Sequence, residues 1–324
     1  MTRFSFNKLL RKLHDKNGKI MIKHISFNSR IATAFLAVIF HSSFAVLHAD
    51  EVEAVMLASE YQNGEQEIRV LLPDNYNGAK QYPVVYVLPP QGGLKGYAKG
   101  FEVLKKMDAH NKYEFIVVTM SFEKEPWYGD HFEDKKLRQA SYIKEFLIPY
   151  IENKYSTFGT LEGRLLLGFS KSGLGAFSLI LKYPDFFGYA ASWDAPISFK
   201  TWTQPSTSRA GTYTYRGMRD NYGSAEQLSL FRPDLNITKN GKYFREKTRL
   251  VLFGHAKFRI HNDKTHYWLN NAGIKHLYNN KIKCGHKWAP IWIEPALEFM
   301  KNTIEETKNA NSSSLKTQRE FIGR

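Results

Sequence analysis

The clearest chemical signal in the sequence is a serine in a short turn between an apolar run and a helix-like stretch. Residues 165–176 read LLLGFSKSGLGA, which is the strand–turn–helix context of a nucleophile elbow, G-x-S-x-G. Gly168 supplies the small residue before Ser170, whereas Ser172 stands in place of the second glycine. A phosphate-binding loop would need G-x-x-x-x-G-K-[ST], which this sequence lacks. We therefore interpret Ser170 as a nucleophile rather than as part of a plain strand–helix turn.

A serine hydroxyl is a weak nucleophile unless a base takes its proton, and histidine is the usual base. The histidines after the elbow are His255, His261, His266, His276 and His286. His286 lies in KCGHKW, a glycine-containing loop after the last strand-like segment and before the last helix-like one. In the chain order serine, acid, histidine, this is where the base is expected. The sequence therefore predicts that His286 acts on Ser170.

The elements that must position these residues alternate between strand-like and helix-like patterns. Apolar or alternating runs predict strands at 67–73, 83–90, 114–120, 164–169, 188–193, 249–254 and 274–279. Helical spacing predicts helices at 97–109, 140–155, 174–183 and 290–306, with a kink at Pro149. Such alternation indicates an α/β fold, with a mostly parallel central sheet and helices on both faces. Reactive groups gather at the carboxyl ends of the strands in such sheets.

One region within the predicted domain, and another that follows it, lack this alternation of strands and helices. Residues 196–247 have little clear periodicity and predict a lid-like insertion over the active site, within a single domain at 50–306. The polar stretch 307–324 predicts a disordered tail.

The first 49 residues have the pattern of a secretory signal peptide. Eight Lys or Arg accompany one Asp, an apolar run covers Ile31–Phe40, and the small residues Ala45 and Ala49 offer cleavage points. The apolar run is short for a membrane span, which takes about 20 residues, although an uncleaved anchor is the alternative. Met21 is an alternative start, which would make residues 1–20 an extension. We expect export to the periplasm or medium, with no stable membrane association after signal cleavage.

Composition and charge narrow the class of protein further. The chain has 324 residues, 43% of them hydrophobic, so it can bury a large core. Its one cysteine, Cys284, excludes an intramolecular disulfide and a multi-cysteine zinc site. The net charge of +15 is high, but the sequence has no nucleic-acid-binding signature. No metal-ligand spacing or nucleotide motif stands out, so we expect no metal, no cofactor and no nucleic-acid partner.

Residues from about 65 to 305 resemble the esterase D / carbohydrate esterase family 1 group of α/β-hydrolases. The matching segments are KQYPVVYVLPP, FIVVTMSFEKEPWYGD, SYIKEFLIPYIENKY, GFSKSGLGA followed by KYPDFFGYAAS, and the closing GHKW. Members of this group include feruloyl and acetylxylan esterases, enterochelin esterases and mycolyltransferases. The resemblance implies an α/β-hydrolase fold and a serine esterase with a Ser-His-Asp triad.

The sequence departs from this group at the triad acid. The strand after the insertion usually ends in G-x-x-D, but here Lys257 occupies the position of the acid. Two carboxylates could substitute: Asp194, just past the preceding strand, and Asp263, on the loop expected after Lys257. We favour Asp194, because a strand-end residue is better positioned than a loop residue, and Asp263 is the alternative acid. An Asp194 oxygen should then lie within about 3.2 Å of a His286 ring nitrogen.

A second departure lies in the loop expected to bind the oxyanion. The group has His-Gly after its first central strand, whereas this chain reads PPQGG at 89–93, and proline has no N–H to donate. One donor should be the backbone N–H of Lys171, the residue after the nucleophile. The other would be the backbone N–H of Gln91 or of a neighbouring glycine. The alternative is that this loop is an inert turn.

The insertion supplies the expected substrate surface. Its aromatic and basic residues are Trp202, Tyr213, Tyr215, Arg216 and Tyr222. These side chains suit sugar rings or aryl acyl groups; the alternative is that they only pack the lid. The main hypothesis is an exported serine hydrolase of carboxylic esters, with a small-molecule or carbohydrate ester as its substrate. An acyltransferase would differ only in the group that accepts the acyl chain. A catalytically silent binding protein is the other alternative, and the sequence leaves the oligomeric state open.

Overall fold

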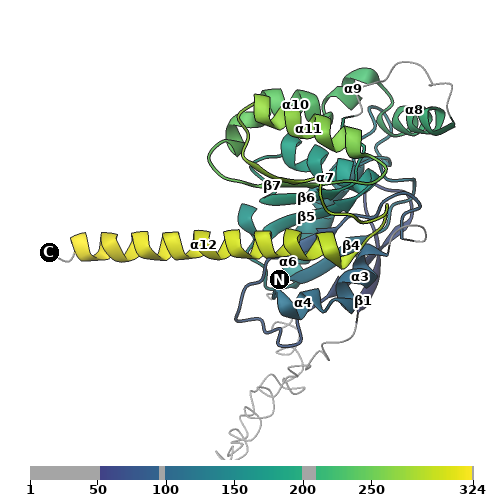
Figure 1. Cartoon of the computed structure of the whole chain (residues 1–324). Helices are drawn as coiled ribbons and strands as arrows, with labels where there is room; N and C mark the ends of the chain where they lie inside the picture. The colour runs from purple at the N-terminus through teal and green to yellow at the C-terminus, as the bar shows by residue number, and fades with distance from the viewer. Residues whose placement is uncertain (1–51, 95–98, 199–208, 323–324) are drawn as a thin grey trace, which may run out of the picture. The chain divides into compact units, whose positions relative to one another are not determined.

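A computed structural model of the chain describes residues 52–94, 99–198 and 209–322. These residues form an eight-stranded sheet in the order β1-β2-β4-β3-β5-β6-β7-β8 (Figure 1). The strands are β1 (Glu53–Ala58), β2 (Glu65–Leu71), β3 (Val84–Val87), β4 (Ile116–Met120), β5 (Arg164–Phe169), β6 (Tyr189–Trp193), β7 (Leu250–Phe253) and β8 (His276–Asn279). β1 pairs with β2 and β2 with β4 in antiparallel fashion, and every pair from β4 to β8 is parallel. The predicted α/β class with a mostly parallel sheet is confirmed.

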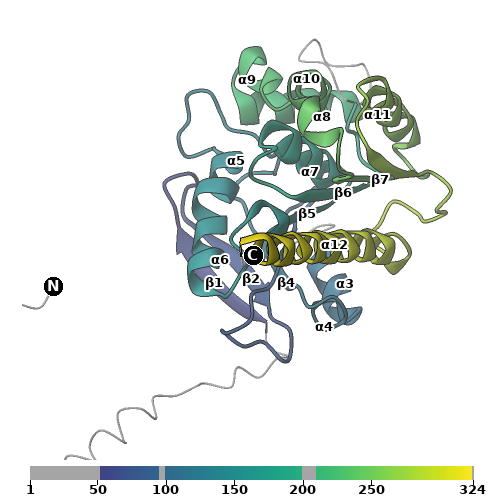
Figure 2. The same cartoon turned by 90° about the vertical axis from the view of Figure 1, so that its left-hand side faces the viewer.

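Helices cover both faces of this sheet (Figures 1 and 2). One face carries α3 (Gly100–Lys106), α4 (Ala109–Lys112) and α12 (Pro290–Ile322). The other side carries α5 (Gln139–Ser141), the π-helical segment η2 (Tyr142–Leu147), α6 (Ile148–Lys154), α7 (Lys171–Lys182), α8 (Arg209–Tyr222), α9 (Ala225–Ser229), α10 (Pro233–Asn240), the short 3₁₀ helix η4 (Gly241–Phe244) and α11 (Arg259–Asn271). A further 3₁₀ turn, η3 (Leu161–Gly163), leads into β5.

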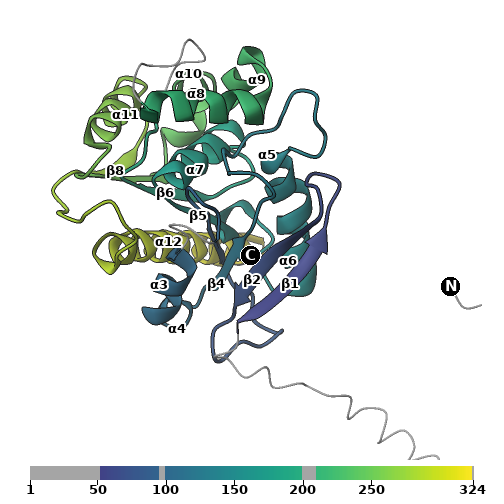
Figure 3. The same cartoon turned by 90° about the vertical axis from the view of Figure 1, so that its right-hand side faces the viewer.

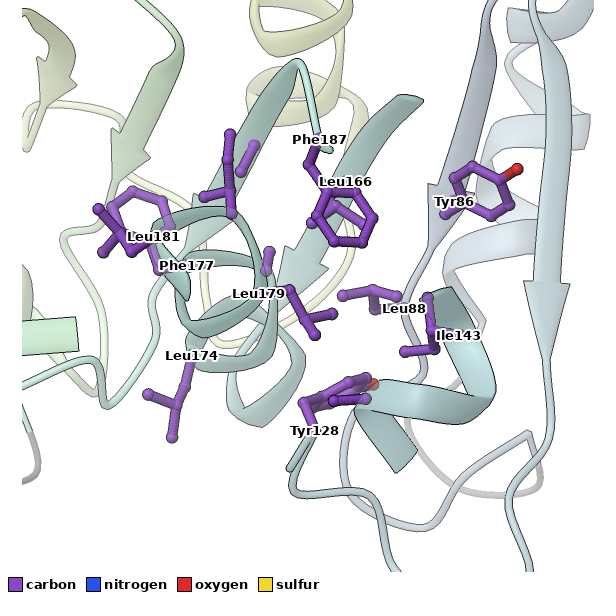
Figure 4. Packing of buried hydrophobic residues seen from close by; sticks show 14 of the residues in the cluster. Tyr86, Leu88, Tyr128, Ile143, Leu166, Leu174, Phe177, Leu179, Leu181 and Phe187 are labelled. Atoms are coloured by element: carbon purple, nitrogen blue, oxygen red, sulfur yellow. The ribbon is translucent and has the colours of Figure 1, made fainter. Parts of the chain in front are cut away.

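The central strands are buried on both faces, which explains why they appear in the sequence as continuous apolar runs. In β5, Leu166 belongs to the core cluster on the α7 side, whereas Leu165 and Leu167 belong to the cluster on the α12 side. Figure 4 shows the first cluster, to which α7 contributes Phe177 and η2 contributes Ile143. Because each strand is clamped between two cores, the carboxyl ends of neighbouring strands are held in a fixed arrangement.

The helix predicted at 140–155 is present but contains a π-helical segment. Pro149 lies in the first turn of α6, directly after η2. Proline has no N–H for the carbonyl four residues earlier, and a wider π turn accommodates that missing bond. The predicted kink therefore takes the form of η2.

The insertion 196–247 is largely helical, which its sequence did not indicate. Its helix α10 packs against α7, and Asn240 Nδ2 donates to Leu181 O (2.7 Å) at the end of α7 remote from Ser170. α8 and α9 instead contact the loop after β4, through hydrogen bonds from the Tyr222 hydroxyl to Trp127 O (2.7 Å) and from Gln227 Nε2 to Asp130 O (2.9 Å). The expectation that the whole insertion covers the active site is therefore wrong for α10, because α10 packs against α7 instead.

The structure also differs from prediction at both ends of the domain. β1 was not predicted; its side chains alternate between half-buried and exposed, as an edge strand's do (Figure 3). The last helix continues to Ile322, where a disordered tail was predicted from 307. This stretch contains no Gly or Pro before Gly323, so nothing in it interrupts a helix that packing has already started. Among the described helices, none has the length and hydropathy of a membrane span.

Candidate active site

Ser170 lies at the junction of β5 and α7, in a backbone conformation that few residues adopt. Its φ is 57° and its ψ is −125°, a strained state that costs on the order of 1–3 kcal/mol. Hydrogen bonds hold it on both sides. Its N–H donates to Trp193 O (3.0 Å), and its carbonyl accepts from Gly173 N–H (3.0 Å) and Leu174 N–H (3.2 Å). The sharp turn predicted from the sequence is therefore present, with Ser170 partly exposed in it.

The elbow is tight because β5 and α7 approach each other closely. A Cβ atom at Gly168 would lie 2.1 Å from Ser172 O, a backbone atom that cannot move aside. Ser172 itself is fully buried. Its Oγ accepts from Phe169 N–H and donates to Phe169 O, both at 2.9 Å. The serine that replaces the usual glycine therefore braces the turn.

Asp194 follows β6 at the neighbouring strand end and is fully buried. Its Oδ2 accepts from His286 Nδ1 (2.6 Å) and Lys257 N–H (2.9 Å), and its Oδ1 accepts from Phe258 N–H (2.7 Å). Burial raises the pKa of Asp194, but these hydrogen bonds outweigh burial and hold the pKa below its ordinary value. Asp194 is therefore a carboxylate at neutral pH. Lys257, which occupies the expected position of the acid, contributes its backbone N–H to Asp194.

His286 lies in the loop between β8 and α12, with its side chain 24% exposed. Its ring packs between Phe169 and Phe258, at centroid distances of 4.5 and 5.4 Å. Because Nδ1 donates to Asp194, the neutral ring carries its lone pair on Nε2. Phe169 directly precedes Ser170, so the imidazole lies beside the elbow. The contact between Asp194 and His286 that the sequence predicts is present.

Asp263, the alternative acid, lies elsewhere. It is part of helix α11, not of a loop as expected, and it is half-exposed. Its Oδ1 accepts a hydrogen bond from the Tyr278 hydroxyl, and its Oδ2 lies 3.4 Å from Arg259 Nε. These partners hold its carboxylate on the α11–β8 side, while Asp194 contacts His286.

The loop after β3 presents one backbone amide differently from the others. Gly92 N–H donates to Glu125 Oε1 (2.9 Å) and Gly93 N–H donates to Pro90 O (3.2 Å). Within the described residues, Gln91 N–H has no hydrogen-bond acceptor. Lys171 is the first residue of α7, and the first N–H groups of a helix are not used by its own carbonyls. The oxyanion role of Gln91 and Lys171 stays a prediction.

Two charged side chains next to these donors were not predicted. The Lys171 ammonium is buried and pairs with Glu125 Oε1 at 2.7 Å. Burial lowers the pKa of Lys171 to about 8, although Glu125 opposes the shift. One feature of the sequence could have indicated this pair. Lys171 lies inside the elbow motif, directly after the nucleophile, and a lysine that is buried there needs a nearby carboxylate.

The predicted substrate surface is only partly visible. Tyr222 is buried and its hydroxyl binds Trp127 O, so it packs α8 rather than offering a face to substrate. Arg216 is exposed. Trp202, Tyr213 and Tyr215 lie outside the residues whose side chains the structure describes.

Three of the remaining candidate histidines make other contacts, whereas the buried Nδ1 of the fourth, His255, has no hydrogen-bond partner among the described residues. His261 Nδ1 lies 2.9 Å from Ser198 Oγ, and burial lowers the pKa of His261. His266 Nδ1 lies 2.7 Å from His276 Nε2, between α11 and β8. In the part of the chain that the structure describes, no three His, Cys, Asp or Glu side chains form a group that could hold a metal ion.

The fold and the site together define the class of this protein. A serine in a strained turn after a parallel strand, followed along the chain by an aspartate at the next strand end and by a histidine in a later loop that pairs with it, is the site of an α/β-hydrolase. The family model described as "Putative esterase" matches residues 59–294, and the chain therefore belongs to this family of esterases.

Two curated proteins have sequences similar to this chain. Esterase Rv1288 and Esterase MT1326, from Mycobacterium tuberculosis strains H37Rv and CDC 1551, are each 30% identical to it over 137 residues. The match covers 41% of this chain and only 30% of the length of each relative.

Solved structures share the fold at low sequence identity. A ferulic acid esterase superposes with a TM-score of 0.61 and 20% identity, over 78% of this chain and 98% of its own. The S-formylglutathione hydrolase FrmB of Staphylococcus aureus superposes with a TM-score of 0.61, 14% identity and the same coverage. The Mycobacterium tuberculosis protein MPT51 superposes with a TM-score of 0.61 and 13% identity, over 79% of this chain and 98% of its own.

Proposed function

We propose that this chain hydrolyses carboxylic esters with Ser170 as nucleophile, His286 as base and Asp194 as acid. One observation carries the proposal: the 2.6 Å hydrogen bond from His286 Nδ1 to the buried Asp194 carboxylate, beside a serine held in a strained elbow. This carboxylate selects the tautomer of His286 and stabilises the imidazolium that forms during the reaction. Membership of the esterase family supports ester cleavage as the reaction.

The reaction proceeds in two halves. Ser170 Oγ attacks the ester carbonyl while His286 Nε2 takes its proton, and His286 then returns the proton to the departing alkoxide as the C–O bond breaks. Water attacks the resulting acyl-serine, again giving a proton to His286. The acid is released when that proton returns to Ser170. The net reaction consumes one ester and one water, and the products are one carboxylic acid and one alcohol.

The negative charge on the tetrahedral intermediate needs donors that are already in place. We assign this role to the backbone N–H groups of Lys171 and Gln91. The assignment of Lys171 is supported by its position directly after the nucleophile, at the start of α7. Gln91 supports it through an N–H that has no acceptor among the described residues, unlike the N–H groups of Gly92 and Gly93.

We further propose that the protein is exported and that its substrates are acyl esters of carbohydrates. The basic and apolar pattern of residues 1–49 supports export. The substrate class is supported by the ferulic acid esterase among the similar structures. Transfer of the acyl group to a second hydroxyl instead of water would be detected as an ester product when a sugar is added to the assay.

A fluorophosphonate probe and a short-chain aryl ester test the nucleophile. The wild-type protein should be labelled once, at Ser170, and Ser170→Ala should lose both labelling and turnover, the latter by on the order of 10⁶. Ser198→Ala is a matched control, because Ser198 also lies against a histidine, His261. Turnover by Ser170→Ala within about tenfold of wild type would place the nucleophile elsewhere.

A further inference from the structure

The residue after the nucleophile has an unusual side chain for its position. The Lys171 side chain is only 6% exposed, and its ammonium lies over the Trp127 ring at 4.4 Å from the ring centroid. A buried ammonium is unfavourable unless it is paired. Its carboxylate partner is Glu125, at 2.7 Å. This pair lies directly behind the elbow, because Lys171 is the first residue of α7.

A single oxygen of Glu125 joins three segments of the active site. Glu125 Oε1 accepts from Lys171 Nζ (2.7 Å) at the elbow and from Gly92 N–H (2.9 Å) in the loop after β3. Glu125 itself belongs to the loop after β4. The elbow, the loop after β3 and the loop after β4 are therefore connected through one carboxylate.

The loop that carries Glu125 is itself fixed by buried polar groups. Gln139 Oε1 accepts from Trp127 N–H (2.7 Å) and Tyr128 N–H (2.9 Å), and Gln139 Nε2 donates to Glu125 O (3.3 Å). The Tyr128 hydroxyl donates to Pro89 O, at the start of the loop after β3. These hydrogen bonds hold the backbone at Glu125 in place, so Glu125 can anchor the loop after β3.

We propose that Glu125 and Lys171 are positioning residues that hold the loop after β3 so that Gln91 N–H points at the oxyanion. This inference rests on the proposed function and assigns the arrangement of its oxyanion site. Gly93 N–H donates to Pro90 O, which lies in the same peptide plane as Gln91 N–H. Gly92 N–H is bound to Glu125, and the plane that follows Gln91 is fixed by this contact. Without it, the two glycines with positive φ, Gly92 and Gly93, would leave the loop free to rotate.

The two partners differ in burial, and this difference makes the proposal testable. Glu125 is 33% exposed, so water can hydrate its carboxylate when Lys171 is removed. Lys171 is buried, so removal of Glu125 takes away the carboxylate that offsets the desolvation of its ammonium. Burial already lowers the pKa of Lys171 to about 8, which means that folding disfavours its charged form. Lys171→Met should therefore leave the melting temperature unchanged or raised, while Glu125→Ala should lower it.

Activity should follow a different order from stability. With a short-chain aryl ester, Lys171→Met and Glu125→Ala should each lower kcat by about 10- to 100-fold, because a displaced oxyanion donor loses transition-state stabilisation, and KM should change little. Glu125→Gln should retain most of kcat, because its amide oxygen can still accept from Gly92 N–H. In the wild type, kcat should decline as the pH rises through about 8 and Lys171 loses its proton. Lys171→Met should lack this decline.

Two variants of similar residues serve as controls. Lys182→Met removes another partly buried lysine of α7, which lies over the Phe231 ring and does not contact the loop after β3. Glu123→Ala removes a neighbouring carboxylate that accepts from Asn63 N–H. Both should keep wild-type kcat.

The outcomes separate this inference from the proposed function. Fluorophosphonate labelling at Ser170 in every variant would show that the nucleophile is intact. If Ser170 is labelled and Glu125→Ala keeps wild-type kcat, the positioning role is overturned and the esterase assignment stands. A parallel loss of kcat and melting temperature in Lys171→Met would also overturn it, because a purely structural role predicts that result. Absence of labelling in the wild type would instead refute the proposed function.

Discussion

At the scale of single residues, one carboxylate organises the candidate site. Asp194 accepts hydrogen bonds from His286, Lys257 and Phe258, which come from two different loops. Lys257 thereby supports the acid through its backbone although its side chain cannot replace one. Although Lys257 replaces the usual acid, His286 therefore still has a carboxylate partner.

Substitution of the two candidate acids should separate their roles. Asp194→Asn should lower kcat on a short-chain aryl ester by roughly 10³–10⁴, because an amide favours the wrong His286 tautomer. Asp263→Asn should leave kcat nearly unchanged, since Asp263 binds Tyr278 and Arg259. Steady-state kinetics and a thermal melt of each variant provide the measurement. A large loss in Asp263→Asn with an active Asp194→Asn would move the acid to Asp263.

At the scale of elements, the junction of β5 and α7 decides how Ser170 is presented. The strand and the helix approach so closely that only glycine fits at position 168, and Ser172 ties the turn together through both its hydrogen bonds. Strain at Ser170 is sustained by this packing, because buried elements on both sides over-determine the turn.

A methyl group at Gly168 should therefore be poorly tolerated. Gly168→Ala places a Cβ against Ser172 O and should destabilise the protein by about 1–3 kcal/mol or more, with loss of esterase activity as the elbow opens. Gly78→Ala is the matched control, because a Cβ there meets nothing within 4 Å, and it should leave stability nearly unchanged. Urea unfolding midpoints at constant m-value measure both. Equal midpoints for the two variants would show that the elbow can widen.

At the scale of the whole molecule, one sheet clamped between two cores carries every residue of the candidate site. The sheet begins at Glu53, a few residues beyond the proposed cleavage points at Ala45 and Ala49. Removal of the segment before Asp50 would therefore leave the sheet and both cores complete.

Export of the protein should thus yield a mature chain that begins near residue 46 or 50. Intact-mass spectrometry of the protein from the periplasm or medium measures its first residue directly. The basic n-region and the short apolar run are the physical reason for expecting cleavage. A soluble exported protein that still begins at Met1 or Met21 would contradict this prediction.

Local sequence patterns were enough to predict many of the strands and the nucleophile elbow. Buried parallel strands need apolar side chains on both faces, and a tight elbow needs small residues, so β5, Gly168 and Ser170 could be predicted from sequence. Helix α11 could not, because its buried residues are Asn262, Thr265 and Leu269 and the hydrophobic period is nearly absent. The helical end of α12 was missed for a similar reason, since its polar sequence carries no apolar stripe.

Only the tertiary structure decided which distant polar groups meet. The sequence offered two acids for His286, and the choice depends on where α11 begins, because the two residues just before it, Lys257 and Phe258, donate backbone N–H groups to Asp194. The pairing of Lys171 with Glu125 is equally invisible in sequence, because 46 positions separate the two residues. Hydrophobic patterns report which faces are buried, whereas hydrogen bonds between loops depend on distances that the packed elements alone establish.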